Sequence, residues 1–297
     1  MPIASSAYIG RFAPSPSGPL HFGSLIAAVG SYLQAKSQFG QWLVRMEDID
    51  TPRMVSGMDS DILRTLEQYG LHWDGVVLYQ SQRLDRYQHV FAQLQQQQLL
   101  YGCQCTRKHI SAMGGFYTNH CAALNLCHEP LAWRLRSSNV PSCYADLLFG
   151  QQQIPAELAA EDYIIKRRDG LFAYQLVVVI DDIDQGITEV IRGADLLQMT
   201  PRQQALCQLL GAKAPRYGHL PLAVMQPGLK LSKQNHAPAV SQWSQPQVLT
   251  AVLDFLGHLP PRELQQAPVA EQLNWACNNW QLAKVPAKME INAIEYR

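Results

Sequence analysis

The chain has 297 residues, of which 47% are hydrophobic and 16% charged, a composition typical of a globular protein with one large domain or two unequal ones. Lys plus Arg and Asp plus Glu both number 24, so overall charge does not indicate a nucleic-acid partner, although a local basic face suffices to bind phosphates. The N-terminal "MPIASSAYIG" is unlike a signal peptide, and no apolar run approaches the roughly 20 residues of a membrane span. Seven cysteines, an odd number, favour free thiols over disulfides. We therefore expect a cytoplasmic globular protein with no membrane contact.

The stretch "RFAPSPSGPLHFGS" (11–24) lies between two regular segments. The residues before it, with Tyr8, Ile9 and Phe12, indicate a buried strand. The residues after it, "SLIAAVGSYLQAKSQFG", place apolar side chains at helical spacing and end at a glycine. The turn from a strand into a helix is where α/β proteins bind ligands, because backbone N–H groups point outward there.

The first hundred residues continue to alternate between strand and helix patterns. "QWLVRMEDID" (41–50) indicates a strand that runs into acidic residues, and 56–70 an amphipathic helix that ends at Gly70. Residues 76–100 indicate a short strand and a long helix, whose glutamine run 95–98 we interpret as a solvated face. This alternation predicts a parallel sheet with crossover helices.

Beyond residue 100 the pattern changes. Residues 101–168 are rich in cysteine, glycine and irregular stretches, which indicates a subdomain inserted into the sheet domain. In 174–193, "YQLVVVIDDIDQGITEVIRG" predicts a buried strand, an acidic turn and a second strand. The remainder after 219–234 is expected to be mostly helical, with breaks near Pro260–Pro261 and Pro286. The predicted units are therefore 1–100 and 169–240 for the two halves of the sheet domain, 101–168 for the insertion and 241–297 for a short helical region.

Two short motifs have complementary chemistry. In "HFGS" (21–24), His21 and Ser24 begin a helix, where an imidazole and backbone N–H groups suit the phosphates of a nucleotide. In "KLSKQ" (230–234), Lys230 and Lys233 offer mobile ammonium groups that can follow the charge of departing pyrophosphate. Alternatively, His21 only caps the helix and the lysines belong to a solvated loop.

The order of four segments narrows these alternatives. "RFAPSPSGPLHFGS", "VRMEDIDTPR", "YQLVVVIDDIDQGITEVIRGADLL" and "HLPLAVMQPGLKLSKQ" together resemble the catalytic core of glutamyl-tRNA synthetases over roughly residues 7–240. These are class I aminoacyl-tRNA synthetases, with the signatures HIGH and KMSKS. The first signature keeps His21 and Gly23 here, and the second keeps both lysines but ends in Gln234. The resemblance implies an α/β fold, with a Rossmann-like catalytic core built on a parallel sheet, and an ATP site that includes His21, Gly23, Ser24, Lys230 and Lys233.

Only about sixty residues follow the second signature, too few for a large anticodon-reading region. The chain thus resembles a truncated paralogue family, the glutamyl-Q tRNA(Asp) synthetases, and we expect no anticodon-binding domain. The resemblance implies that glutamate is activated with ATP and transferred to queuosine, at the first anticodon position of tRNA(Asp). Two alternatives are a minimal glutamyl-tRNA synthetase that charges a tRNA 3′ end and a non-catalytic tRNA-binding relative. No long exposed apolar stripe stands out, so we expect a monomer.

Glutamate has two carboxylates and one ammonium, so its pocket needs about two cations and one anion. Arg11 and Arg192 suit the carboxylates, Glu47 suits the ammonium, and Ser15 and Tyr174 can donate orienting hydrogen bonds; all five match positions of the family pattern. Asp181 and Asp182 are interpreted as structural, because the substrate carboxylate is itself the nucleophile in adenylate formation. Mg²⁺ is expected to arrive with ATP, held mostly by phosphates and water.

The insertion contains a second candidate site. Cys103, Cys105 and Cys121 in "CQCTRKHISAMGGFYTNHC" suit Zn²⁺, which prefers four ligands in a tetrahedron. Chemistry alone favours His120 or Cys127 as the fourth ligand, whereas the family pattern C-x-C…Y-x-x-x-C implies Tyr117. Such a zinc would be structural. Alternatively, these three are plain buried or reactive cysteines that hold no metal. Cys143, Cys207 and Cys277 are expected to be simple core or surface thiols.

Two basic stretches accompany the insertion. "TRK" (106–108) and "KRR" (166–168) could contact tRNA phosphates or simply form solvated faces.

Overall fold

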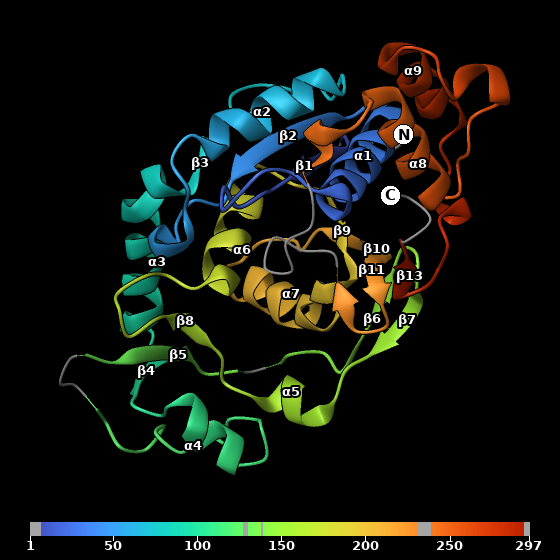
Figure 1. The fold of residues 1–297 in the computed structure, drawn as a ribbon. Helices are drawn as coiled ribbons and strands as arrows, with labels where there is room; N and C mark the ends of the chain where they lie inside the picture. The colour runs from blue at the N-terminus through green and yellow to red at the C-terminus, as the bar shows by residue number, and fades with distance from the viewer. Residues whose placement is uncertain (1–6, 127–129, 138, 231–238, 294–297) are drawn as a thin grey trace, which may run out of the picture.

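The computed structural model describes residues 7–126, 130–137, 139–230 and 239–293 (Figure 1). Its centre is a layer of parallel strands. β1 (Ile9–Phe12), β2 (Gln41–Met46) and β3 (Leu78–Tyr79) pair in parallel in that order. β9 (Glu189–Gly193) pairs in parallel with β10 (Arg216–Leu220), and the backbone N–H of Thr188 donates to the carbonyl of Ile9 at 2.9 Å, which brings β9 beside β1. The predicted α/β fold with a parallel sheet is confirmed.

The helices of the first hundred residues also agree with the sequence patterns. α1 (Phe22–Ser37), α2 (Met58–Gln68) and α3 (Leu84–Gln96) follow β1, β2 and β3 in turn. α1 buries apolar side chains on most of its circumference, because the sheet covers one side of it and C-terminal helices the other. Residues 95–98 are exposed, as a solvated face requires.

One secondary-structure prediction is wrong. The segment expected to form a strand and an acidic turn is instead a helix, α6 (Tyr174–Asp184), and only β9 at its end is a strand. The β-branched run Val177–Ile180 favours a strand by propensity, but all four residues are buried between α3, β8 and α7 (Thr200–Leu209). A helix buried on every side has no polar face, so its sequence lacks the 3.6-residue repeat of apolar side chains that identifies a helix. Packing in the core then outweighs the strand propensity of the β-branched residues.

The predicted insertion forms its own small sheets but shares a core with the catalytic layer. β4 (Leu100–Cys103), β5 (Ala132–Leu135) and β8 (Ile164–Lys166) form an antiparallel sheet, while β6 (Cys143–Asp146) and β7 (Gly150–Gln153) form a hairpin. Two short helices, α4 (Arg107–Ala112) and α5 (Ala156–Ala160), connect them. Leu135 and Ile165 pack into the same cluster as α3 and α6, so this segment depends on the catalytic core for its burial.

The residues after 240 are mostly helical, as expected. α8 (Gln245–Phe255) and α9 (Val269–Asn279) pack against α1, next to it in Figure 1. The chain then returns as β13 (Glu290–Asn292), a strand that the sequence did not predict. β13 pairs in parallel with one edge of β11 (Leu222–Gln226), and β12 (Leu229–Lys230) pairs antiparallel with the other edge. In the described ranges, every helix is too short or too polar to cross a bilayer.

Candidate active site and metal centre

A cavity of about 830 Å³ lies where the carboxyl ends of β1 and β2 meet the first residues of α1 and α6. This is the position at which parallel α/β sheets bind ligands, and the volume is within the usual range for small-molecule sites. Prolines and glycine in the 11–24 turn keep the chain open above the sheet. The cavity is lined by six of the residues predicted from the sequence: Ser15, His21, Gly23, Ser24, Glu47 and Tyr174.

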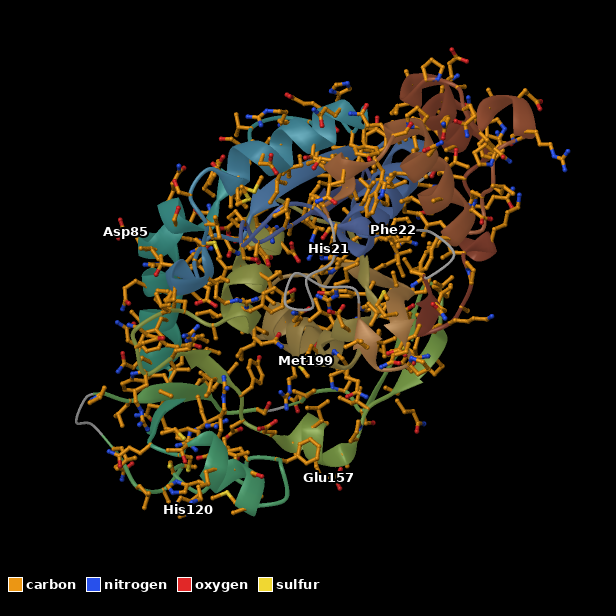
Figure 2. The ribbon with its side chains drawn as sticks, viewed as in Figure 1. His21, Phe22, Asp85, His120, Glu157 and Met199 are labelled. Atoms are coloured by element: carbon orange, nitrogen blue, oxygen red, sulfur yellow. The ribbon has the colours of Figure 1, made fainter. Side chains whose placement is uncertain are left out.

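His21 occupies the N-cap position of α1. The backbone N–H of Ser24 donates to its Nδ1 at 3.2 Å, so the helix-capping interpretation is confirmed. Capping does not remove the residue from the site, because the capped ring also lines the cavity (Figure 2, where His21 lies near the centre of the molecule). The helix N-terminus and the imidazole therefore face the same space, as the phosphate interpretation requires.

The lysines of the second signature are only partly covered by the structure. Lys230 is the last residue of β12, and Gly228, two residues before it, lines the cavity with φ +78°. Lys233 and Gln234 lie outside the described residues. The predicted role of both ammonium groups stays a prediction.

Tyr174 connects the cavity with both predicted carboxylate-binding arginines. Burial raises the pKa of its hydroxyl, the positive charges of Arg192 and Arg11 oppose this shift, and Glu47 and Asp182 reinforce it. Of the five residues predicted to bind glutamate, Ser15, Glu47 and Tyr174 therefore line the cavity, whereas Arg11 and Arg192 do not belong to its lining.

Glu47 stands at the end of β2 and has an unusual acidity. Burial raises the pKa of its carboxyl group to about 7. The charges of Arg45 and Arg11 oppose the shift, while Asp182 and Asp181 reinforce it. Since no ion pair of Glu47 is formed in the described ranges, its charge is available to an ammonium group that enters the cavity.

Arg11 is already neutralised by the protein. Its Nε donates to Asp182 Oδ1 at 3.1 Å, and Arg45 Nη2 donates to the same oxygen at 2.6 Å. All three side chains are nearly inaccessible to solvent. Arg11 does not line the cavity, so its predicted contact with a carboxylate of glutamate remains untested.

Asp181 and Asp182 act as structural carboxylates, as expected. Asp181 accepts hydrogen bonds from Tyr87 at 2.9 Å and from Gln80, and pairs with Arg83 at 2.7 Å. Asp182 binds the two arginines of β1 and β2. The acidic end of α6 is thereby bound to β1, β2, α3 and the turn that precedes α3, and neither carboxylate lines the cavity.

Arg192 also lies behind the cavity wall, but its surroundings differ from those of Arg11. It donates to His219 Nε2 at 3.1 Å, to Gln203 Oε1 at 2.7 Å, and to Thr200 Oγ1 at 2.9 Å. These acceptors are neutral, and among the described residues Arg192 takes part in no ion pair. A buried guanidinium without a carboxylate partner is energetically costly unless an anion completes the site.

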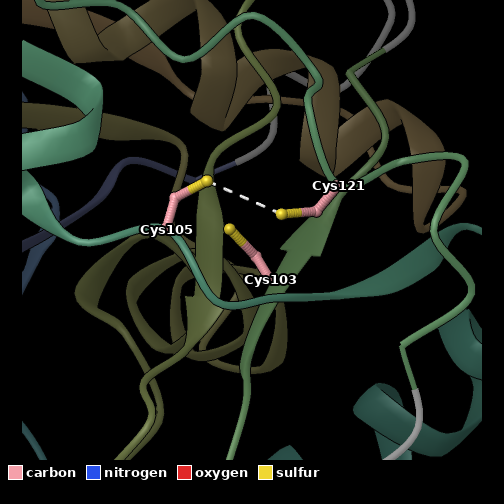
Figure 3. Close-up of side chains that lie close together, drawn as sticks. All are labelled: Cys103, Cys105 and Cys121. Atoms are coloured by element: carbon pink, nitrogen blue, oxygen red, sulfur yellow. Dashed lines mark hydrogen bonds between the residues drawn. The ribbon is translucent and has the colours of Figure 1, made fainter. Parts of the chain in front are cut away.

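The three cysteines of the insertion converge. The Sγ atoms of Cys103, Cys105 and Cys121 lie within 4.8 Å of one another and point toward a common centre (Figure 3). Cys105 and Cys121 are 3.6 Å apart, sulfur to sulfur, close to the roughly 3.8 Å that a tetrahedral zinc with Zn–S bonds of about 2.3 Å imposes. The arrangement can hold a metal ion.

Tyr117 is the best placed of the proposed fourth ligands. Its ring is buried and its hydroxyl accepts from the backbone N–H of Cys121 at 2.8 Å, which holds the oxygen beside the thiols. His120 is exposed and is not part of the cysteine group (Figure 2 shows it at the edge of the molecule). Cys127 lies outside the described residues. The fourth ligand therefore remains a prediction in favour of Tyr117.

Sequence reasoning missed the residues that support both sites. Arg134 is buried, donates to Cys103 Sγ at 3.2 Å and lies 3.6 Å from the ring centroid of Tyr117, so it holds both side chains beside the cysteine group. Asp146 and His219 were also missed, although they bind each other at 2.6 Å. No local signal marks such pairs, because 31 and 73 residues separate the partners.

The basic stretches of the insertion divide into two kinds. Residues 106–108 are exposed. Arg167, by contrast, lines the cavity and pairs with Asp50 at 3.1 Å, while Arg168 donates to the carbonyl of Gln104 beside the cysteines. Only the second stretch therefore lies at the cavity, and contact of either with tRNA is still a prediction.

Comparisons with known proteins give a consistent result. The family model for "tRNA synthetases class I (E and Q), catalytic domain" matches residues 9–265. The chain is 54% identical over 291 residues to the glutamyl-Q tRNA(Asp) synthetase of Vibrio vulnificus CMCP6, covering 98% of this chain and 95% of the relative. It is 52% identical over 291 residues to the protein of the same name from Escherichia coli K12, covering 98% and 94%.

The fold has a counterpart among solved structures. A glutamate tRNA ligase from Elizabethkingia meningosepticum, in complex with its amino acid, superposes with a TM-score of 0.79 at 23% identity and covers 98% of this chain and 68% of that one. At this identity the likeness extends to the fold alone. Together with the high identity of the full-length relatives and the match to the catalytic-domain family, it leads to one conclusion: the chain belongs to the glutamyl-Q tRNA(Asp) synthetase family of class I tRNA synthetases, and is a ligase-type enzyme.

Proposed function

We propose that this enzyme activates L-glutamate with ATP and transfers it to queuosine at the first anticodon position of tRNA(Asp). The observation that supports activation is the cavity whose lining brings together His21, Ser24, Glu47 and Tyr174. The acceptor is suggested by the name of the relatives at 54% and 52% identity. The same relatives favour this acceptor over the tRNA 3′ end that a minimal glutamyl-tRNA synthetase would charge.

In the proposed activation, a carboxylate oxygen of glutamate attacks the α-phosphorus of ATP and pyrophosphate leaves. The carboxylate is already ionised, so no protein base is needed. The N-terminus of α1 and His21 stabilise negative charge on the phosphates, and Lys230 and Lys233 follow the charge that moves onto pyrophosphate. Mg²⁺ enters bound to ATP, held mostly by phosphates and water.

In the proposed pocket, Glu47 pairs with the ammonium group of glutamate, and Arg11 and Arg192 favour its two carboxylates. Ser15 and Tyr174 orient the substrate. Transfer then requires a nucleophilic group of queuosine to attack the carbonyl carbon of the adenylate while AMP leaves. Because the acceptor is an anticodon base, the anticodon loop itself must reach the cavity, whose lining includes Arg167, a side chain paired with Asp50 and Asp169.

We further propose one structural zinc at Cys103, Cys105, Cys121 and Tyr117. The three sulfurs lie within 4.8 Å of one another, and Cys105 and Cys121 are separated by about the distance that a tetrahedral zinc imposes. The site belongs to a glycine-rich segment whose small cluster of buried side chains is centred on the ligands themselves. A metal there would stabilise the fold of the segment, away from the reacting atoms.

The competing acceptor, a tRNA 3′ end, is tested by removing that end. Queuosine-containing tRNA(Asp) that lacks its terminal adenosine should accept labelled glutamate as well as intact tRNA does. Complete loss of labelling would instead establish aminoacylation of the 3′ end. Lys233→Ala is the control for activation: it should abolish adenylate formation in either enzyme, whereas unchanged labelling would contradict the assigned role of the second signature.

A further inference from the structure

Arg192 is connected to the inserted hairpin through one histidine. His219 on β10 lies between the two: its Nε2 receives the Nε–H of Arg192 at 3.1 Å, and its Nδ1 lies 2.6 Å from Oδ2 of Asp146 on β6. The exposed fractions of Arg192, His219 and Asp146 are 6%, 0% and 5%. The three groups thus form a buried chain from the insertion to the back of the cavity.

The hydrogen-bond partners fix the proton on this histidine. A guanidinium N–H can only donate, so Nε2 of His219 must be unprotonated and accept. The carboxylate of Asp146 can only accept, so Nδ1 must carry the proton. Burial lowers the pKa of His219, and the charge of Arg192 acts in the same direction while Asp146 opposes it, so a neutral ring agrees with the geometry.

This arrangement orients Arg192 without cancelling its charge. A carboxylate in direct contact, as Asp182 is with Arg11, would neutralise the guanidinium. A neutral imidazole accepts the Nε–H instead, and Gln203 and Thr200 accept from the two Nη atoms. The direction of the side chain is set from three sides, and beside the cavity residues Gly193 and Leu196 no carboxylate of the described residues forms a direct ion pair with it. Asp195 also lines this part of the cavity, and its charge reaches His219.

Asp146 in turn is held so that only one oxygen reaches the histidine. Its Oδ1 accepts from the backbone N–H groups of Leu148 at 3.0 Å and Phe149 at 2.9 Å, with a third from His219 at 3.4 Å. Oδ2 is left for Nδ1 of His219. The adjacent Leu147 N–H donates to the carbonyl of Tyr217 on β10 at 2.8 Å, which fixes the hairpin against the catalytic sheet.

We propose that Asp146 and His219 are a positioning pair for substrate recognition: the inserted hairpin sets the tautomer of His219, which holds Arg192 as a cation without a direct carboxylate partner for a carboxylate of glutamate. The proposal rests on the proposed function, in which Arg192 binds that carboxylate. It assigns the inserted hairpin a part in amino-acid recognition.

Asp146→Asn is the sharpest test. The three backbone donors require an oxygen at the Oδ1 position, so the new NH₂ group must face Nδ1 of His219. The ring then places its proton on Nε2, where it opposes the Nε–H of Arg192. We expect the KM for glutamate in ATP–pyrophosphate exchange, measured with and without tRNA, to rise by about tenfold or more, and the KM for ATP to change less than about twofold.

A second substitution that restores the acceptor for Arg192 distinguishes a positioning role from a general loss of structure. In His219→Gln the amide oxygen can accept from Arg192 whatever stands at position 146, so Asp146→Asn/His219→Gln should have a lower KM for glutamate than Asp146→Asn alone. The matched control is His258→Gln, a buried histidine that accepts from the backbone N–H of Gln281 far from this chain of contacts. It should leave both KM values unchanged.

A direct readout needs no activity. In ¹⁵N-histidine-labelled wild-type protein, the resonances of His219 should show a protonated Nδ1 and an unprotonated Nε2, and Asp146→Asn should reverse them. A protonated Nε2 in the wild type, an unchanged KM for glutamate in Asp146→Asn, or equal increases in both KM values would overturn the proposal. Absence of glutamate-dependent exchange in the wild type would instead refute the proposed function, while the tautomer measurement would still stand.

Discussion

Glu47 is a cavity residue whose charge changes near neutral pH. Its pKa is raised to about 7 by burial, against an ordinary value of 4.5, so the folded protein binds this proton more tightly than the unfolded chain does. The stabilisation is complete below pH 4.5 and is lost as the pH rises through 7. At pH 8 the ionised group therefore destabilises the fold, by at most roughly 3 kcal/mol.

Glu47→Gln should consequently raise the melting temperature at pH 8 and change it little at pH 4.5. Thermal unfolding of both proteins across this range measures the difference. Glu67→Gln, at an exposed position of α2, serves as the matched control and should shift neither value. A Glu47→Gln protein that is less stable than the wild type at pH 8 would show that the carboxylate is stabilised in the folded state.

Single residues of the site were predictable where a motif fixed them. The turn 11–24 and the "RMED" segment placed Ser15, His21, Gly23, Ser24 and Glu47 on the cavity. The partners of the arginines were not predictable, because 171 residues separate Arg11 from Asp182 and 27 separate Arg192 from His219. Such contacts depend on which elements the tertiary fold brings together, and the spacing of residues in the sequence does not predict that arrangement.

At the scale of elements, α6 is fastened to β1 and β2 by charge. Asp182 pairs with two buried guanidinium groups, Arg11 and Arg45, whereas Asp184 at the end of the same helix pairs with the more exposed Arg83 and Arg86. Removal of a carboxylate from a buried group leaves uncompensated cations, at a cost of about 3–5 kcal/mol. A partly exposed pair contributes about 1 kcal/mol or less.

Asp182→Asn should therefore lower the free energy of unfolding by several times as much as Asp184→Asn does. Urea unfolding followed by circular dichroism measures both variants against the wild type. Equal losses would contradict the assignment of Asp182 as the structural centre of this contact.

The same helix marks the limit of prediction for the fold. Alternating strands and helices were recognisable through residue 100 because each element has one buried and one solvated face. Val177–Ile180 of α6 are all buried, so this part of the helix has no polar face that would show a helical period. Its β-branched residues therefore led to the wrong prediction of a strand. β13 was missed for a related reason: three residues, Glu290–Asn292, become a strand only because β11 lies beside them.

At the scale of the whole molecule, the insertion joins the catalytic layer at two places. Leu135 and Ile165 share the core of α3 and α6, and the β6–β7 hairpin contacts β10. The segment around Cys103 and Cys121 is different, since its buried cluster is small and consists largely of the proposed ligands. We expect its order to depend on the metal.

Cys121→Ser should reduce bound zinc from one ion per chain to much less than one and lower hydrogen-exchange protection around residues 100–126, while protection of α1 is retained. Cys143→Ser is the matched control, because that thiol is exposed and lies outside the cluster. Metal analysis and hydrogen exchange by mass spectrometry measure both effects. Full zinc occupancy in Cys121→Ser would contradict the ligand set.

The central claim concerns the acceptor, and it is tested most directly by supplying labelled glutamate and ATP with two pools of tRNA(Asp) that differ only in queuosine. We predict label on the queuosine-containing pool alone, located in the anticodon loop. Equal labelling of both pools at the 3′ end would contradict the claim and identify the enzyme as a glutamyl-tRNA synthetase. No label in either pool would contradict glutamate transfer altogether and leave a non-catalytic relative.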